Sequence, residues 1–204
     1  MTPGRLHALI DGVFAIALTL LVLGLPRPEA SNGLVHDLVH SWPSYVAYLV
    51  SFGTIGLVWI EHHGMMSGVV YINRRFLELT LVFLLFVSII PWPTALASSY
   101  AGTGQARTAA VVYAVVMMLM GLSFAACWRY LDHHHELVSE PARTAFAAGT
   151  RRAVIGGGVY VVAIAVAPIS PTASFAIDAA IAVYFAVTRS EVPGLIHQAA
   201  LRDP

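Results

Sequence analysis

The chain has 204 residues, of which 58% are hydrophobic and only 11% are charged. Average soluble domains carry roughly 25% charged residues, so this composition indicates a membrane protein. The formal net charge is zero, which gives no reason to expect a nucleic-acid partner. The single cysteine, Cys127, excludes an intramolecular disulfide. It lies in an apolar run, and we expect a small buried hydrophobic side chain there.

The first apolar segment is "RLHALIDGVFAIALTLLVLGLPRP", residues 5–28. The apolar run after Asp11 is near the upper limit of the hydrophobic region of a secretory signal peptide, and Pro26 and Pro28 follow this run without an A-x-A-like cleavage site. We therefore expect a retained membrane span.

About 20 apolar residues cross the roughly 30 Å hydrocarbon core of a bilayer as a helix. Six segments meet this requirement, which predicts an all-α membrane protein with a single six-helix transmembrane domain over residues 1–204. The expected spans are about 6–25, 43–61, 76–97, 106–128, 152–168 and 172–188.

The arginines predict the orientation of these spans, because positive charge concentrates on the cytoplasmic side of membrane proteins. With the N-terminus inside, only Arg27 and Arg107 fall outside. The nine inside are Arg5, Arg74, Arg75, Arg129, Arg143, Arg151, Arg152, Arg189 and Arg202. Both termini are therefore expected in the cytoplasm, with residues 129–151 as a cytoplasmic loop.

The first span presents an apolar stripe with one hydroxyl. At about 100° per residue, Ile16, Thr19, Leu20 and Leu23 share a face about 100° wide. Asp11 lies about 140° from Ile16 on the same helix. The spacing therefore predicts that Asp11 and the stripe face different surroundings.

An acid inside a membrane span is costly and needs a partner. For Asp11, a buried structural network is expected at the cytoplasmic ends of the first two spans, and an interfacial acid at a helix start is the alternative. The expected members of the network besides Asp11 are Arg5, Trp59, His62 and His63. At the start of the third span, Glu78 follows Arg74 by four residues, which predicts an ion pair along the helix.

Three motifs resemble the transmembrane protein 175 family, the endolysosomal potassium channels and their bacterial relatives. In the first span, Arg5 is followed by Leu9-Ile10-Asp11, which stands where the family has a Phe-Ser-Asp triplet. The run "GVFAIALTLLVL" comes next, where the family has an alanine- and leucine-rich run with a threonine. The second motif is "SFGTIGLVWIEHH" (51–63), and the third is "NRRF" (73–76) with "PWPT" (91–94). The matching covers about the first 100 residues. The missing serine hydroxyl implies a network that either is weaker or relies more on Arg5, Asp11 and the histidines.

The resemblance implies a potassium-permeable cation channel in the bacterial plasma membrane. Bacterial relatives have one six-helix repeat per chain and assemble as homotetramers, with the first helices around a central pore. The pore constriction then maps to Ile16, Leu20 and Leu23, and a polar ring that influences potassium preference maps to Thr19. The implied partners are the other subunits, the lipid bilayer and monovalent cations. No catalytic residue, metal or cofactor is implied.

The carbonyl filter "TVGYG" of ordinary potassium channels is absent from the sequence, and "GGGVY" (156–160) is interpreted as close helix packing. Ions would pass rings of aliphatic side chains, which block them by expelling water. The Thr19 hydroxyl either contributes oxygen ligands or bonds to the Ala15 carbonyl one turn earlier, and the two roles are compatible.

Two other groups of polar residues are weaker candidates. The consecutive His133, His134 and His135 would point in different directions on a helix, so a metal site is not favoured. Asp178 in the last span is expected either to bind cations at an outer vestibule or, more in keeping with its helical setting, to pack against a hydroxyl or backbone group.

Two other classes of protein compete with a channel. A secondary transporter would have broken helices and polar residues at mid-membrane, whereas most acids here fall near the ends of spans. A membrane di-iron enzyme needs spaced histidine boxes, which are missing, so we do not expect an enzyme.

Overall fold

The computed structural model describes residues 3–28 and 33–187, and their regular structure is helical. The α-helices are α1 (Pro3–Leu20), α2 (Leu34–His40), α3 (Trp42–Ser67), α4 (Arg74–Ile89), α5 (Pro91–Tyr100), α6 (Ala106–His133), α7 (Arg143–Val166) and α8 (Pro171–Val187). Short 3-10 helices are η1 (Leu21–Gly24), η2 (His135–Leu137) and η3 (Glu140–Ala142). The prediction of an all-α fold is confirmed.

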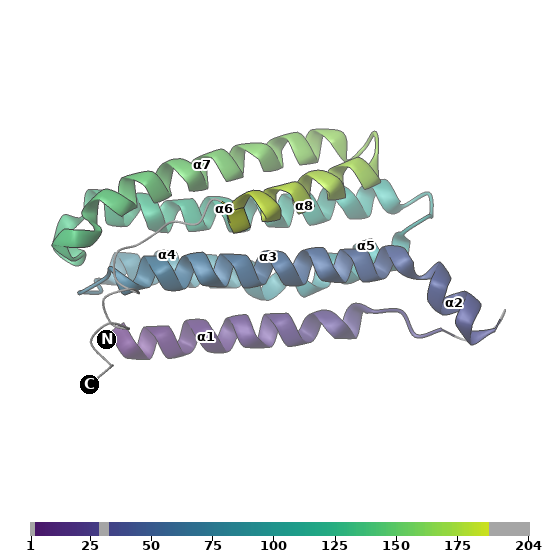
Figure 1. Cartoon of the computed structure of the whole chain (residues 1–204), viewed down its shortest axis with the longest axis horizontal. Helices are drawn as coiled ribbons and strands as arrows, with labels where there is room; N and C mark the ends of the chain where they lie inside the picture. Colours follow the sequence, from purple (N-terminus) through teal and green to yellow (C-terminus); the bar gives the residue numbers. More distant parts are fainter. Residues whose placement is uncertain (1–2, 29–32, 188–204) are drawn as a thin grey trace.

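The long helices lie side by side along one axis (Figure 1). Five helical segments are long and apolar enough to cross a membrane: Gly4–Gly24, Trp42–Ser67, Arg74–Tyr100, Ala106–His133 and Glu140–Val166. The sixth expected span forms the apolar but shorter α8, and its expected last residue, 188, lies outside the described residues. The fold is that of a membrane protein.

The third long segment consists of two helices. Pro91 lacks a backbone N–H, so the hydrogen-bond pattern of α4 ends there and α5 begins. At the other end of α4, the Asn73 side chain accepts a hydrogen bond of 2.9 Å from the Phe76 N–H. This cap satisfies one of the N–H groups that a helix start leaves without a partner.

Residues 129–151 do not form the loop that the sequence predicted. Helix α6 continues to His133, and α7 already begins at Arg143. The reason is that hydropathy detects only the apolar part of a helix, whereas the polar ends of α6 and α7 remain helical. The short connection is held by hydrogen bonds to the end of α3, from the Ser139 N–H to the Gly68 carbonyl (2.9 Å) and from the Val70 N–H to the Leu137 carbonyl (2.8 Å).

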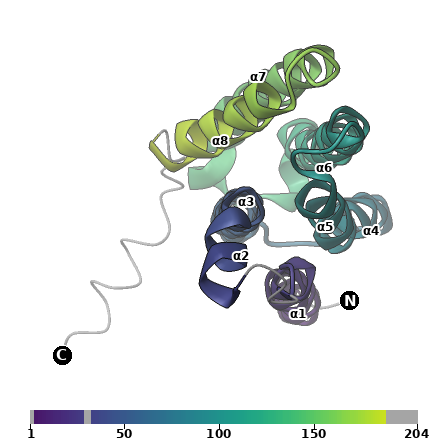
Figure 2. The same cartoon turned by 90° about the vertical axis from the view of Figure 1, so that its right-hand side faces the viewer.

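Helix α1 lies at one side of the bundle, and α7 and α8 lie at the opposite side (Figures 1 and 2). Between them, α6 packs against α4, α5, α7 and α8. The core holds Phe14 of α1, Phe83 of α4 and Trp128 of α6, all almost fully buried. One face of α1 therefore belongs to the chain's own core.

The two ends of the bundle differ in charge. The described arginines at the end where α1 begins are Arg5, Arg74, Arg75, Arg129, Arg143, Arg151 and Arg152, and the other end holds Arg27 and Arg107. We call these the arginine-rich end and the arginine-poor end. Arg189 and Arg202 lie outside the described residues.

Three smaller predictions are confirmed. Cys127 is fully buried, as expected for a small hydrophobic side chain in an apolar helix. The side chains of Arg74 and Glu78 form an ion pair of 2.9 Å. Gly156 packs so closely against α8 that a Cβ atom there would lie 2.5 Å from the Phe185 ring, which explains the glycine in "GGGVY".

Candidate pore-lining face of the first helix

Helix α1 has two distinct faces. Its buried face packs on the rest of the chain and consists of Leu6, Ile10, Phe14, Ala17 and, in η1, Leu21. These residues recur every three or four positions, as expected for one side of a helix. On another side, Ile16, Leu20 and Leu23 are 61%, 41% and 69% exposed in the single chain. The predicted stripe is thus left uncovered by the chain's own helices.

The last turn of this segment is a 3-10 helix, η1, and not the α-helix that the sequence predicted. Residues three apart lie directly in line in a 3-10 helix, so Leu20 and Leu23 share one face. Gly24 ends the turn against α5, where a Cβ atom would lie 2.9 Å from the Ala95 Cβ and 3.2 Å from its Cα. Only glycine permits this approach, which fixes the end of the stripe against the bundle.

Thr19 is exposed on the same side of α1. Its hydroxyl donates a hydrogen bond of 2.9 Å to the Ile16 carbonyl, and not to the Ala15 carbonyl named as the alternative from the sequence. A hydroxyl that donates its proton to the backbone still has oxygen lone pairs that accept bonds or bind a cation. The bond to the backbone therefore leaves the oxygen available on the exposed face.

Asp11 contacts α3. The Trp59 Nε1–H donates a hydrogen bond of 2.9 Å to the Asp11 carboxylate. The Trp59 ring lies 5.8 Å from the His63 ring, and the His63 ring lies 6.4 Å from the His7 ring, measured between centroids. Sequence reasoning missed His7, although it precedes Asp11 by one helical turn and so lies on the same side of α1.

The other two members of the expected network lie elsewhere. His62 is 1% exposed in the core, and its ring stacks on Phe83 at 5.2 Å with an interplanar angle of 3°. Arg5 is exposed and forms no hydrogen bond or ion pair with another described residue. Ile10, which occupies the serine position of the family triplet, is 2% exposed and belongs to the core.

An ion pair on the far side of α3 was also missed by sequence reasoning. The Arg152 guanidinium of α7 lies 3.3 Å from the Glu61 carboxylate, and both side chains are largely buried. Glu61 directly precedes the two histidines in the sequence, but nothing in the local pattern identifies a partner 91 positions later. This pair joins α3 to α7 near the arginine-rich end.

The weaker candidates are placed as follows. The Nδ1 atoms of His133 and His134 lie 2.9 Å from backbone carbonyls of α6. Within residues 3–28 and 33–187, the His, Cys, Asp and Glu side chains form no group of three or more suited to a metal ion. Asp178 is buried, but neither carboxyl oxygen has a hydrogen-bond partner among the described residues, so the hydroxyl or backbone partner expected from the sequence is absent there.

Comparisons with known proteins identify the family. A potassium channel of Streptomyces collinus is 38% identical over 93% of this chain and 94% of its own length. The chain belongs to the TMEM175 family. The family model, described as "Endosomal/lysosomal potassium channel TMEM175", matches residues 5–91. This match contains every residue of the exposed stripe and of the expected network.

Two further TMEM175 relatives define the extent of the likeness. The crystal structure of a lysosomal potassium-selective channel TMEM175 homolog from Chamaesiphon minutus has a TM-score of 0.81 and 37% identity, and it covers 91% of this chain and 96% of that chain. The human endosomal/lysosomal proton channel TMEM175 is 29% identical over 70% of this chain and 30% of its own length. The likeness to bacterial members therefore extends well beyond the first 100 residues.

The family and these relatives are described as channels, and not as enzymes. The expectation that the chain is not an enzyme is confirmed.

Proposed function

We propose that this chain is one subunit of a homotetrameric potassium channel in the bacterial plasma membrane, with six helices crossing the bilayer. The named relatives that cover nearly the whole chain are potassium channels, one of them potassium-selective. The first helices, α1 with η1, surround the ion pathway. Rings of Ile16, Leu20 and Leu23 form its constriction, and Thr19 supplies its hydroxyl groups.

The arginine-rich end is assigned to the cytoplasm. Seven described arginines lie at that end against two at the other, and this asymmetry follows the positive-inside rule. The N-terminus and the end of α8 then lie in the cytoplasm. The connection between α6 and α7 lies there too.

The observation that carries the proposal is the division of α1 into two faces. Its buried face anchors the helix to its own subunit, while Ile16, Leu20 and Leu23 are free to face the same residues of neighbouring subunits. A narrow ring of such side chains offers no ligand to replace the hydration shell of an ion. Water leaves the ring, and ions stop there until it widens.

This gate needs no carbonyl filter. The hydroxyls of four Thr19 residues lie one helical position from Leu20 and keep their oxygen lone pairs free. They supply the oxygen ligands nearest to the constriction, which accounts for a preference among monovalent cations.

The test is the substitution of Ile16. Ile16→Asn hydrates the narrowest ring and is expected to raise basal potassium flux several-fold, because water and ions then cross without dewetting. Ile16→Ala is expected to raise flux by widening the ring, and Ile16→Leu to change it little. The measurement is potassium flux through equal amounts of assembled protein in liposomes.

Val22 provides the matched control. It is 51% exposed, similar to the stripe residues, but lies about 120° from Leu23 in the 3-10 turn. Val22→Asn should therefore leave basal potassium flux at the wild-type level, even if it lowers the stability of the protein. Wild-type flux in Ile16→Asn, or equal opening by Val22→Asn, would exclude a gate on this face of α1.

A further inference from the structure

Asp178 occupies the inward face of α8, on the opposite side of the bundle from α1. It is 1% exposed and lies about 10 Å along the axis from the start of the helix. Phe175 and Ile181 lie one turn before and one turn after it, and both face the other helices. The carboxyl group is therefore deep within the subunit, far from the proposed pore.

The polar groups described around Asp178 are hydroxyls and not cations. Helix α8 packs against α3, α6 and α7. From α6 and α7, Tyr113 and Tyr160 come close enough to interact electrostatically with the carboxyl group. On α3, the nearest charged group that faces this side is Glu61, which is paired with Arg152. Among the described residues, no arginine forms an ion pair with Asp178.

The Tyr113 hydroxyl is part of a buried chain of hydrogen bonds. It lies 3.0 Å from the Ser51 Oγ, which in turn lies 2.8 Å from the Thr94 Oγ1. Neither oxygen of Asp178 takes part in a hydrogen bond with the part of the chain that the structure describes. A carboxylate in this position would carry a full negative charge without compensation.

The energetic comparison decides the state of the group. Burying an ionised carboxylate without a partner costs several kcal/mol or more, whereas the neutral acid loses only hydrogen bonds with water. Buried ionisable groups avoid this cost by changing their protonation state. The described residues offer Asp178 no cation, so a proton is the ligand that makes its burial tolerable.

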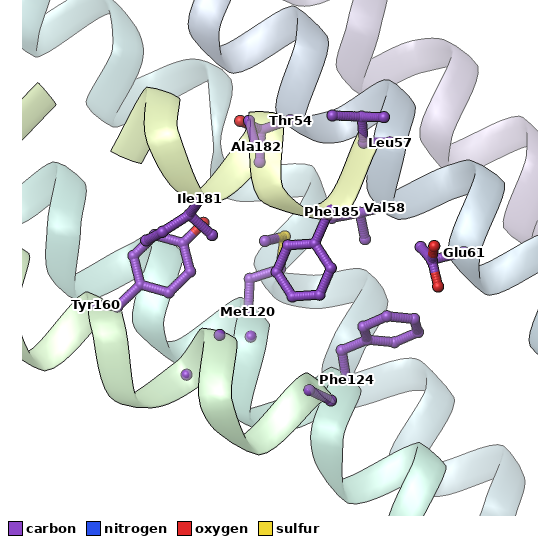
Figure 3. A pocket seen from close by; sticks show the side chains of 14 residues that line it. Thr54, Leu57, Val58, Glu61, Met120, Phe124, Tyr160, Ile181, Ala182 and Phe185 are labelled. Carbon is purple, nitrogen blue, oxygen red and sulfur yellow. The ribbon is translucent and has the colours of Figure 1, made fainter. Parts of the chain in front are cut away.

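Two cavities flank Asp178 along α8. At the arginine-poor end, a cavity of about 760 Å³ is lined by Thr172 and Phe175 of α8 and by Arg107. Toward the arginine-rich end, a narrow pocket of about 30 Å³ lies between α3, α6, α7 and α8. Figure 3 shows Tyr160, Ile181 and Phe185 around this pocket, with Glu61 at its edge. Its lining is almost entirely apolar, and an apolar cavity of this size stays dry, so water reaches Asp178 more readily from the arginine-poor end.

We propose that Asp178 is an internal proton-binding site of the subunit, which exchanges its proton with water through the cavity at the arginine-poor end. The proton is held as the O–H of the neutral acid, and no bond other than O–H forms or breaks. The site is independent of the proposed ion pathway along α1, so it stands or falls separately from the channel function.

Infrared spectroscopy of the purified full chain tests the proposal directly. Wild-type protein at neutral pH should show the C=O stretching band of a protonated carboxylic acid, and Asp178→Asn should lose it. Glu136→Gln, which replaces an exposed acid in the connection between α6 and α7, should keep the band. If wild type and Asp178→Asn do not differ in this C=O band, Asp178 is ionised in the wild type, and the proposal would be overturned.

Transfer of wild-type protein to heavy water tests the exchange, and it does not depend on any variant folding. The band should shift to lower frequency while the protein stays folded, because deuterium replaces the exchangeable proton. A band that persists without a shift would refute access through the cavity at the arginine-poor end.

The dependence of stability on pH gives a separate readout. The folded state holds a proton that the unfolded chain releases at neutral pH, so the wild-type melting temperature should fall as the pH rises. Asp178→Asn removes this proton and should show a smaller fall over the same range. Parallel pH profiles of the two proteins would overturn the proposal.

Discussion

The hydrogen bonding of the Thr19 hydroxyl decides which role this side chain can take in the proposed pore. Its proton is used in a bond to the Ile16 carbonyl, and its oxygen faces out from the exposed side of α1. Within the proposed pore, this oxygen is the polar ligand nearest to Leu20. The effect of the hydroxyl on ion preference can be separated from its effect on helix structure by two substitutions.

We predict that Thr19→Ala lowers the preference for potassium over sodium while the channel still conducts. Removing the hydroxyl removes oxygen ligands but keeps the apolar rings. Thr19→Ser keeps the hydroxyl and should retain most of the preference. Reversal potentials with potassium on one side and sodium on the other measure the effect, and the value for Thr19→Ala should move toward zero. An unmoved reversal potential would remove Thr19 from ion selection.

The two neighbouring histidines of α3 have different surroundings. His63 is exposed beside Trp59, whereas His62 is buried between the rings of Phe83 and Phe124. Consecutive residues on a helix point about 100° apart, so "EHH" supplies one surface group and one core group. Only His63 joins the cluster around Asp11.

At the scale of elements, α7 depends on close contact with α6. Gly149 lies against the Trp128 ring, and a Cβ atom at this position would be 2.4 Å from it. Trp128 is 1% exposed and is packed against Phe146, so it has little room to move. Glycine is required here because the two helices approach so closely.

We predict that Gly149→Ala lowers the free energy of unfolding by about 1–3 kcal/mol, as overpacking of a tight core does. Gly158 on the same helix is the matched control, because a Cβ atom there meets nothing within 4 Å. Gly158→Ala should be neutral or stabilising by about 0.5–1 kcal/mol through helix propensity. Thermal unfolding of the detergent-solubilised proteins provides the comparison. Equal stability of the two variants would contradict the packing argument.

At the scale of the whole molecule, the exposed apolar residues do not by themselves identify a subunit interface. Lipid tails are as apolar as leucine, so a membrane helix that faces lipid looks like one that faces another subunit. The proposed tetramer makes a distinction that the single chain does not. It brings the stripe of α1 near its own copies and leaves the turn between α7 and α8 at the periphery.

We predict that Leu23→Cys is cross-linked between subunits by a short bismaleimide in membranes, giving covalent species up to the tetramer. Ile169→Cys should remain monomeric, because Ile169 is 78% exposed in the turn between α7 and α8, and these two helices lie on the opposite side of the bundle from α1 (Figure 2). The native Cys127 is fully buried and should not react. Denaturing gel electrophoresis resolves the products, and equal cross-linking at both positions would argue against a pore around α1.

Several properties of this protein follow from the local sequence alone. The membrane class and the approximate spans follow from local composition, because any run of about 20 apolar residues crosses a bilayer in the same way. The face shared by Ile16, Leu20 and Leu23 follows from helix periodicity, and the break at Pro91 follows from its missing N–H. Each of these properties depends on residues within a few turns of one another.

The tertiary structure decided what depends on residues far apart in the chain. It set which histidine enters the core, paired Glu61 with Arg152 and extended α7 back to Arg143. It also buried Asp178 near the Tyr113 and Tyr160 hydroxyls, without a cation among the residues described around it. Sequence patterns do not predict these contacts because each requires two or more helices to meet at a particular rotation and height. That geometry is set by the packing of the whole bundle.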